Sequence, residues 1–347
     1  MATSALFLIQ TPLHVINALE AIAVFEIHYS TFFIVTSHQN EKWQLMINQL
    51  LPYNAKTIFC TRNDHDVEEG TKVYAQHLKS LRAEAFDFVF FADARLYIFV
   101  DIVNSLQNSS TILMDDGTGT LLAVHSLTTY GSYYDMSVSR SPERQKKIEI
   151  TKKKYGLWNL KPVNYDLFTV FDYETCDYFK VINNPMKQLC FTHDELDSDV
   201  VLFLGQPFVK INHMTASDYL ICLKQICNRF KGKRMLYLPH PREDITMLEE
   251  LATDSTFSVI QTKLTAENYL ISSTPTPKTV CGFLSTSLWN IMKFQQGVEV
   301  LAFKIPAHRF NKKLSKYRSR SSHVTDLEFI QLIYDYYTRH FPVYPLK

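Results

Sequence analysis

Short runs of β-branched and aromatic residues alternate with longer amphipathic segments along this chain of 347 residues. Strands that alternate with helices in this way form a parallel sheet covered by helices. The predicted strands of the first half are 5–10, 31–36, 57–60, 86–92 and 111–114. Those of the second half are 200–205, 234–238, 257–260, 279–282 and 298–303. The alternation therefore predicts an α/β protein.

The length of the chain suits two domains, each large enough to bury a core. A hydrophobic content of 46% with 20% charged residues is typical of an ordered globular protein. The acidic stretch 194–199 has no periodicity and predicts the junction. We expect Rossmann-like domains over 1–195 and 196–325, facing a central cleft. Residues 326–347 begin with an amphipathic helix (326–340) that we expect to pack back on the first domain.

Charge and cysteine usage exclude several classes of protein. A net charge of +1 excludes nucleic-acid binding by overall positive charge. The six cysteines lack the spacing of a zinc site, so we interpret them as reduced thiols. No basic residue precedes the first apolar run, and no run approaches the ~20 apolar residues that cross a bilayer. These features predict a cytoplasmic protein.

Two adjacent acids, Asp115 and Asp116, follow the predicted strand 111–114 and precede Gly117. Open α/β sheets bind ligands at the carboxyl ends of their strands, and the glycine lets the backbone bend close to a substrate. Adjacent acids rarely ionise independently, so one of them is suited to take a proton from a sugar hydroxyl. Asp-Asp-Gly is also common in ordinary turns, and this alternative stays open.

His240 follows the predicted strand 234–238, between Pro239 and Pro241 and just before Arg242. The two prolines fix the backbone on both sides, so the chain sets the direction of the imidazole. A histidine beside a guanidinium can donate a hydrogen bond or a proton to a departing phosphate. Most of the 12 histidines need only a structural explanation, and this setting distinguishes His240. A cleft between the domains would bring it to the acids.

Three further features point to ligand binding. An apolar helical pattern follows three hydroxyl residues, Ser285, Thr286 and Ser287. Hydroxyls and free backbone N–H groups at a helix N-terminus bind anions. The alternative is plain N-capping, which needs only one of the three hydroxyls. Glu267 is a candidate acceptor for ribose hydroxyls, although it is one acid among many. Both halves begin with a strand that runs into a proline-containing turn, Gln10-Thr11-Pro12 and Gly205-Gln206-Pro207.

These motifs together resemble a known family. In order and approximate spacing they are similar to those of bacterial lipooligosaccharide sialyltransferases, glycosyltransferase family 52, which is related to other bacterial sialyl- and polysialyltransferases. The resemblance extends from Ala5 to about Ala302. It rests on five motifs: Asp115-Asp116-Gly117-Thr118-Gly119, Leu204-Gly205-Gln206-Pro207, Tyr237-Leu238-Pro239-His240-Pro241-Arg242, Ala266-Glu267-Asn268-Tyr269 and Ser285-Thr286-Ser287.

The resemblance implies a GT-B fold, with the acceptor held mainly by the first half and CMP-sialic acid mainly by the second. It implies that Asp115, or alternatively Asp116, deprotonates a terminal galactoside of lipooligosaccharide or capsule, while His240 assists departure of CMP. The reaction would be inverting and would need no metal or cofactor. The implied donor-binding residues are Gly205, Gln206, Pro239, Pro241, Arg242, Glu267, Ser285, Thr286 and Ser287, and the acceptor-binding residues are Gln10, Thr11, Pro12 and Gly117.

One departure from the family pattern concerns the base. In some members the Gly-x-Pro turn is followed by an aspartate that is the proposed base, whereas Phe208 stands here. The base assignment therefore rests on Asp115, with Asp116 as the alternative. Two other functions stay open: transfer of another sugar, such as glucose, from a different nucleotide donor, and a non-catalytic glycan-binding component of an assembly.

The chain is locally basic despite its neutral total. Lysines gather at 146–147 and 152–154, and the region 304–320 contains Arg309, Lys312, Lys313, Lys316 and Arg318. Solvated faces explain most such runs. A lipid-linked glycan would be met at the inner membrane, where each nearby cation contributes about 1 kcal/mol of attraction to anionic lipid. We therefore expect weak peripheral membrane contact.

Overall fold

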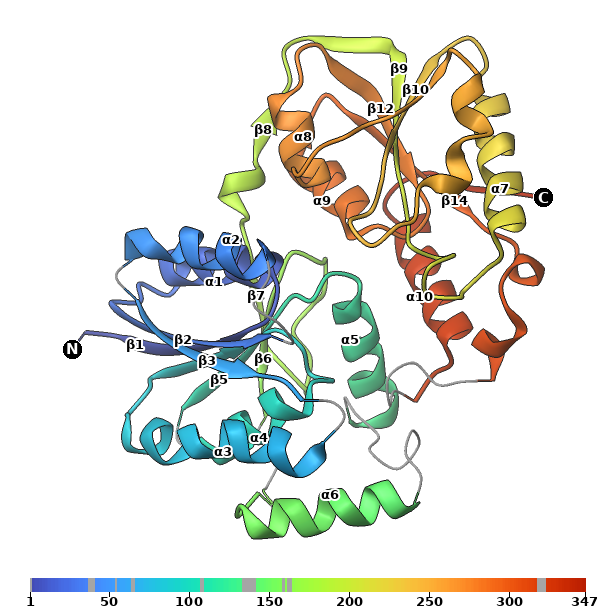
Figure 1. Cartoon of the computed structure of the whole chain (residues 1–347). Coiled ribbons are helices and arrows are strands. Elements are labelled where there is room, and N and C mark those ends of the chain that lie inside the picture. Colours follow the sequence, from blue (N-terminus) through green and yellow to red (C-terminus); the bar gives the residue numbers. More distant parts are fainter. Residues whose placement is uncertain are drawn as a thin grey trace. The chain divides into compact units, whose positions relative to one another are not determined.

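The computed structural model describes residues 2–36, 41–53, 55–63, 66–106, 109–132, 142–157, 160, 164–316 and 323–347 (Figure 1). The chain divides into two compact units, Met1–Met186 with Arg320–His323, and Lys187–Ser319 with Val324–Lys347. The division falls after Met186, earlier than the predicted junction at 195. The acidic stretch was misleading because residues from Leu196 onward already belong to a strand, Leu196–Leu204.

The first unit contains a seven-stranded parallel sheet in the order β3-β2-β1-β4-β5-β6-β7. Its strands are β1 Ser4–Ile9, β2 Tyr29–Thr36, β3 Lys56–Thr61, β4 Phe88–Phe91, β5 Ser110–Met114, β6 Asp166–Thr169 and β7 Val181–Asn183. Its helices are α1 Pro12–Val24, α2 Glu41–Leu50, α3 Val67–Ala83, α4 Tyr97–Ser105, α5 Gly119–Tyr130 and α6 Pro142–Lys154. This order is that of a Rossmann fold.

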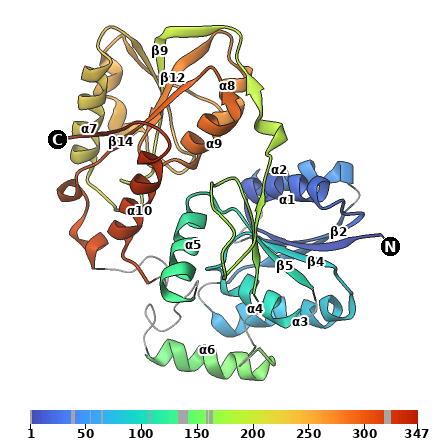
Figure 2. The same ribbon diagram turned by 180° about the vertical axis from the view of Figure 1, so that it is seen from behind.

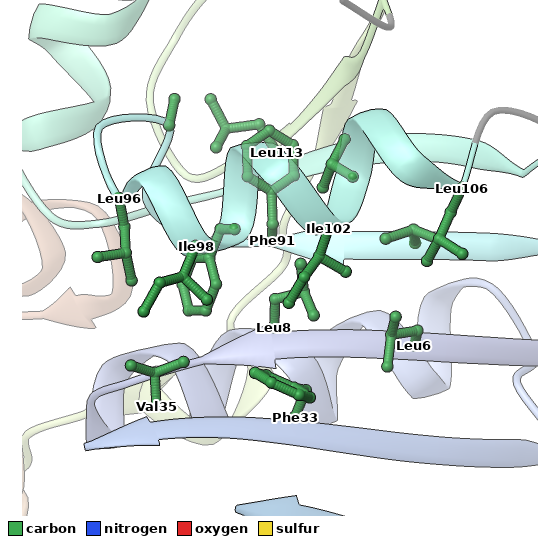
Figure 3. Close-up of a cluster of buried hydrophobic side chains, with 14 of the residues drawn as sticks. Leu6, Leu8, Phe33, Val35, Phe91, Leu96, Ile98, Ile102, Leu106 and Leu113 are labelled. Atoms are coloured by element: carbon green, nitrogen blue, oxygen red, sulfur yellow. The ribbon is translucent and has the colours of Figure 1, made fainter. Parts of the chain in front are cut away.

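Alternating side chains of β1 fill two different cores in the first unit. Leu6 and Leu8 pack with α3 and α4, as Figure 3 shows for α4, whereas Ala5, Phe7 and Ile9 pack on the side of α1 and α2. Successive residues of a strand point to opposite faces, so an apolar run without alternation requires helices on both. Figure 2 shows the two helix layers from behind.

The second unit contains a parallel sheet in the order β11-β10-β9-β12-β14-β15 and a small pair, β13-β8. Its strands are β8 Phe191–Thr192, β9 Leu196–Leu204, β10 Arg234–Leu238, β11 Phe257–Val259, β12 Thr276–Gly282, β13 Gln295–Gln296, β14 Glu299–Lys304 and β15 Val343–Pro345. Its helices are α7 Ala216–Arg229, α8 Ala266–Ser272, α9 Thr286–Phe294 and α10 Asp326–Thr338. This order is again Rossmann-like.

The C-terminal helix α10 was predicted to pack on the first domain, but it belongs to the second unit. The Tyr334 hydroxyl donates to the Phe303 carbonyl at 2.9 Å, and the Tyr337 hydroxyl donates to the Ser285 carbonyl at 2.8 Å. The ring of Tyr336 meets Trp289 edge-on at 5.1 Å. Tyr334 and Tyr337 are amphipathic, so they bury their rings and still satisfy their hydroxyls. The helix is thereby held to β14 and α9.

Two of the predicted basic residues have structural roles. Lys152 of α6 is buried and donates to Asp101 of α4 at 2.6 Å, and Tyr74 donates to the same carboxylate at 2.7 Å. Arg309 donates to Asp218 at 3.1 Å. Arg318 lies outside the described residues. Within the described ranges, no helix combines the length and the apolar character needed to span a bilayer.

All ten predicted strands are present within a few residues of their predicted ends, and the predicted two-domain α/β fold is confirmed. The sequence did not predict five short strands: β6, β7 and β15 near the edges of the large sheets, and the small pair β8 and β13. In each large sheet the strand order reverses at one point, between β1 and β4 in the first unit and between β9 and β12 in the second. Ligands of open α/β sheets bind at the carboxyl ends of strands beside such a point.

Candidate active site

The acid loop follows β5 at the carboxyl edge of the first sheet. Gly117 has φ +57°, a left-handed conformation that glycine adopts without a steric cost. The loop then turns directly into α5, which begins at Gly119. A Cβ at Gly119 would lie 2.8 Å from Arg95 Nη2 and 3.0 Å from Asp116 Oδ2. Because Gly119 has no Cβ, the start of α5 can lie close to the charged side chains of Arg95 and Asp116.

Asp115, the predicted base, is buried with an exposed fraction of 2%. Its Oδ1 accepts from the Thr169 hydroxyl and its Oδ2 from the Val170 N–H, both at 2.7 Å. Its carbonyl accepts from Asn17 Nδ2 at 2.9 Å. Both carboxylate oxygens are thus hydrogen-bonded within the protein, and these bonds join β5 to the end of β6.

Asp116 is the more accessible acid, with 23% of its side chain exposed. His14 Nε2 lies 3.0 Å from Asp116 Oδ1, and Arg95 Nη2 donates to Asp116 Oδ2. The Asp116 N–H donates to the Thr120 hydroxyl at 3.1 Å. Two side chains, His14 and Arg95, thus hold one carboxylate that still reaches the surface.

Arg95 joins Asp116 to a second acid, Asp93, which follows β4. Its Nε donates to Asp93 Oδ1 at 2.8 Å, and its backbone N–H donates to the same oxygen at 2.9 Å. Burial lowers the pKa of Arg95, but the charges of Asp93 and Asp116 outweigh this and raise its pKa overall. The guanidinium therefore stays charged and is shared by two carboxylates.

The predicted acceptor-binding turn lies in the same place. Gln10 Nε2 donates to Asp93 Oδ2 at 3.3 Å, while Thr11 caps α1 by accepting from the His14 N–H and Pro12 occupies its first turn. A hollow at this edge is lined by Ala92, Asp93, Ala94, Arg95, Leu113, Met114, Asp116, Gly119, Thr120 and Ala123. Residues that follow β1, β4 and β5 thus meet at the switch point, and acceptor binding here stays a prediction.

In the second unit, His240 stands at the carboxyl end of β10 and is half-buried. Its Nδ1 accepts a hydrogen bond from the Arg242 N–H at 3.1 Å. A neutral imidazole with this bond carries its proton on Nε2. The Pro-His-Pro-Arg turn therefore fixes both the ring and its tautomer, and makes Nε2 a hydrogen-bond donor.

A buried network ties the His240 turn to the end of β9. Glu243 Oε1 accepts from the Tyr237 hydroxyl at 2.6 Å, and Oε2 accepts from the His240 N–H at 3.0 Å. The Tyr237 hydroxyl is 2.8 Å from that of Tyr219, which accepts from the Gln206 N–H at 3.0 Å. Burial raises the pKa of Glu243, although these hydrogen bonds favour its charged form.

Gly205 and Phe208 complete this turn. A Cβ at Gly205 would collide with Glu243 Oε2 and lie 2.7 Å from the Tyr237 hydroxyl. Phe208, at the place where some members of the resembled family have an aspartate, is 4% exposed and packs among the rings of Phe283 and Phe310. An apolar side chain suits this buried place, where an unpaired carboxylate would be costly.

The predicted anion site lies beyond β12, at the other side of the switch point. Ser285 caps α9 by accepting from the Ser287 N–H at 3.3 Å, and residues 285–287 are half-buried. Glu267, predicted to bind ribose, is 7% exposed, and its Oε1 accepts from Asn290 Nδ2 at 2.9 Å. It therefore joins α8 to α9. Pro239 is half-buried, and Pro241 and Arg242 are exposed beside His240.

The sequence reading missed four residues of these clusters: His14, Asp93, Arg95 and Glu243. Asp93 and Arg95 follow the predicted strand 86–92 just as the acid pair follows 111–114, and this parallel could have identified them. Among the described residues, no group of three or more His, Cys, Asp or Glu side chains is placed to hold a metal ion.

Comparison with known proteins adds the family. Residues 5–304 match the α-2,8-polysialyltransferase (POLYST) family. The chain belongs to this family. The match supports the wider expectation of a bacterial sialyltransferase family, whereas the narrower assignment to family 52 stays a prediction. A search of curated proteins gave no match. Family membership makes the chain a glycosyltransferase, with a nucleotide-sugar donor and a glycan acceptor.

Solved structures with a similar fold include apo UGT2 of Phytolacca americana, with a TM-score of 0.50 and 14% identity over 96% of this chain and 90% of that one. MurG of Acinetobacter baumannii has a TM-score of 0.49 and 9% identity, over 99% of this chain and 86% of that one. At these identities the likeness concerns the fold alone. The predicted GT-B class of two Rossmann-like domains is confirmed.

Proposed function

We propose that this polysialyltransferase-family chain is an inverting sialyltransferase that uses CMP-sialic acid and a terminal galactoside of a bacterial surface glycan. The observation that carries the proposal is the partly exposed Asp116 carboxylate, held by His14 and Arg95 at the switch point of the first sheet. A carboxylate at that edge is suited to accept a proton from a sugar hydroxyl.

In the proposed reaction the acceptor oxygen attacks the anomeric carbon of sialic acid and the bond from that carbon to the CMP phosphate oxygen breaks. The hydroxyl proton goes to Asp116, which replaces Asp115 as the proposed base. His240 donates from Nε2 to the departing phosphate, and the Ser285–Ser287 turn holds the same phosphate. The remaining proposed donor contacts are Gly205, Gln206, Pro239, Pro241, Arg242 and Glu267. No metal takes part, because these donors neutralise one phosphate.

The acceptor side is proposed to involve Gln10, Thr11, Pro12 and Gly117. Beside Asp116, the carboxylates of Asp93 and Asp116 share one guanidinium, that of Arg95. A neutral sugar such as galactose meets no repulsion from these two carboxylates, whereas an anionic terminal sugar does. The two acids therefore support a neutral acceptor terminus.

The test compares Asp116→Asn with Asp115→Asn. We expect Asp116→Asn to remain folded and to lower transfer by about 10²–10⁴-fold, with little change in CMP binding. Asp115→Asn removes the charge that accepts from the Thr169 hydroxyl and the Val170 N–H, so we expect its main effect on the melting temperature. A folded Asp115→Asn protein without transfer, beside an active Asp116→Asn protein, would return the base to Asp115.

The donor is tested without any knowledge of the acceptor. CMP-sialic acid hydrolysis is measured for the native protein and for His240→Ala, which should be impaired because the phosphate loses a donor. Release of UDP from a UDP-sugar, with no release of CMP, would replace sialic acid by another sugar. Tight nucleotide binding without turnover on any galactoside would indicate a non-catalytic glycan-binding component.

A further inference from the structure

A buried polar stripe runs along α1. His14, Asn17 and Glu20 recur at every third residue, so they share one face of the helix, and none is more than 4% exposed. The other buried positions of α1 are small or apolar, such as Val15 and Ala18. Buried polar side chains are costly unless they are hydrogen-bonded, so their partners show what the stripe does.

The stripe contacts both acids of the loop after β5. Asn17 Nδ2 donates to the Asp115 carbonyl at 2.9 Å, and His14 Nε2 lies 3.0 Å from Asp116 Oδ1. Asn17 is itself held by Asn184 Nδ2, which donates to Asn17 Oδ1 at 3.0 Å. One face of α1 thus contacts the backbone of Asp115 and the carboxylate of Asp116.

The direction of the His14 bond follows from its other nitrogen. His14 Nδ1 accepts from the Gln10 N–H at 3.2 Å, so a neutral ring carries its proton on Nε2 and donates it to Asp116. The ring is completely buried, which excludes direct contact with a substrate in this arrangement. His14 and Arg95 approach different oxygens of Asp116 and together restrict its rotation.

We propose that His14 is a positioning residue that orients Asp116 toward the acceptor hydroxyl, with Asn17 holding the loop in register. The proposal rests on the proposed function, because it assigns His14 to the base of that reaction. His14 donates to the carboxylate throughout the cycle and takes no proton from the substrate. Without the Nε2–H donor of His14, the Asp116 carboxylate loses one of its hydrogen bonds and samples other rotamers.

The test compares His14→Gln, which can place an amide N–H near the position of Nε2, with His14→Met, which fills similar space without a donor. His14→Met should lower kcat for transfer about tenfold, the value of one net hydrogen bond, with KM for donor and acceptor unchanged. His14→Gln should recover most of this loss. Val15→Ala serves as a control that weakens the same helix turn without touching the acids.

Donor hydrolysis without acceptor is measured in parallel and should not change in His14→Met. Equal kcat for His14→Met, His14→Gln and the native protein would overturn the proposal, and so would an equal loss in Val15→Ala after correction for folded fraction. If the native protein shows no turnover, the proposed function fails instead. Imidazole ¹⁵N NMR then decides the role of His14: the Nε2–H tautomer should lose its hydrogen-bond shift in Asp116→Ala, and an unchanged signal refutes the contact.

Discussion

Gly205 is the position where one added methyl group should have the largest effect on the second unit. The Cβ of Gly205→Ala would collide with Glu243 Oε2 and lie 2.9 Å from Tyr237 Cε1. Glu243 cannot move away freely, because both of its oxygens accept hydrogen bonds, from Tyr237 and from the His240 N–H. The methyl group must therefore displace either a packed ring or a hydrogen-bonded carboxylate.

The cost follows from these two effects. Overpacking by one methyl group costs about 1–3 kcal/mol, and a buried polar group that loses its partner costs about 1–3 kcal/mol. We expect Gly205→Ala to destabilise the second unit by about 2–6 kcal/mol on these values. Gly282→Ala is the matched control at the end of the neighbouring strand, where the nearest atom to a Cβ is the Leu204 carbonyl oxygen at 3.1 Å. Its cost should be about 1 kcal/mol.

Urea unfolding of the second unit can be followed through buried Trp289 after Trp43 and Trp158 are replaced by Phe. In a Glu243→Ala background the Gly205→Ala cost should fall by about 1–2 kcal/mol, because the closest atom is gone. A Gly205→Ala protein within roughly 0.5 kcal/mol of the native one, which is the range of neutral surface changes, would refute the steric reasoning. Additive effects of Gly205→Ala and Glu243→Ala in the double variant would also refute it.

Three other predictions follow from charges. The pKa of Glu243 is raised in the folded state, so its contribution to stability is complete at low pH and is lost as pH rises through that pKa. Over this pH range the native protein should lose unfolding free energy relative to Glu243→Gln, as measured by urea unfolding at each pH. Acceptors that end in galactose should be preferred over sialylated ones, with one sialic acid added; a ladder of longer products by mass spectrometry would contradict this. Vesicles of anionic lipid should bind the chain weakly through exposed lysines such as Lys146 and Lys147, and sedimentation that does not differ between low and high salt would remove this expectation.

Much of the fold could be read from local patterns. The apolar runs at 5–10 and 111–114 are strands because they are short, rich in β-branched and aromatic residues, and separated by helical segments. Continuous apolar character also indicated burial on both faces, as the two cores around β1 confirm. The junction was harder, because Asp197 and Asp199 suggested a linker although they lie in the first half of β9.

Placement of the C-terminal helix could not be predicted from its amphipathic pattern. That pattern shows which face of α10 is buried but not which unit covers it. Tyr334 and Tyr337 find their partners at Phe303 and Ser285, more than 30 residues away in sequence. Pairing over such distances depends on how the strands are ordered in the sheet, which no local pattern encodes.

The sequence alone placed Asp115, Asp116 and His240 at strand ends, and it determined the rigid Pro-His-Pro turn. Only the tertiary structure distinguished the two acids. Consecutive side chains after a strand point in different directions, so Asp115 turns toward Thr169 and Val170 while Asp116 meets His14 and Arg95. These partners come from three separate segments, and their meeting with the acid loop is decided by the order of β1, β4, β5 and β6 in the sheet.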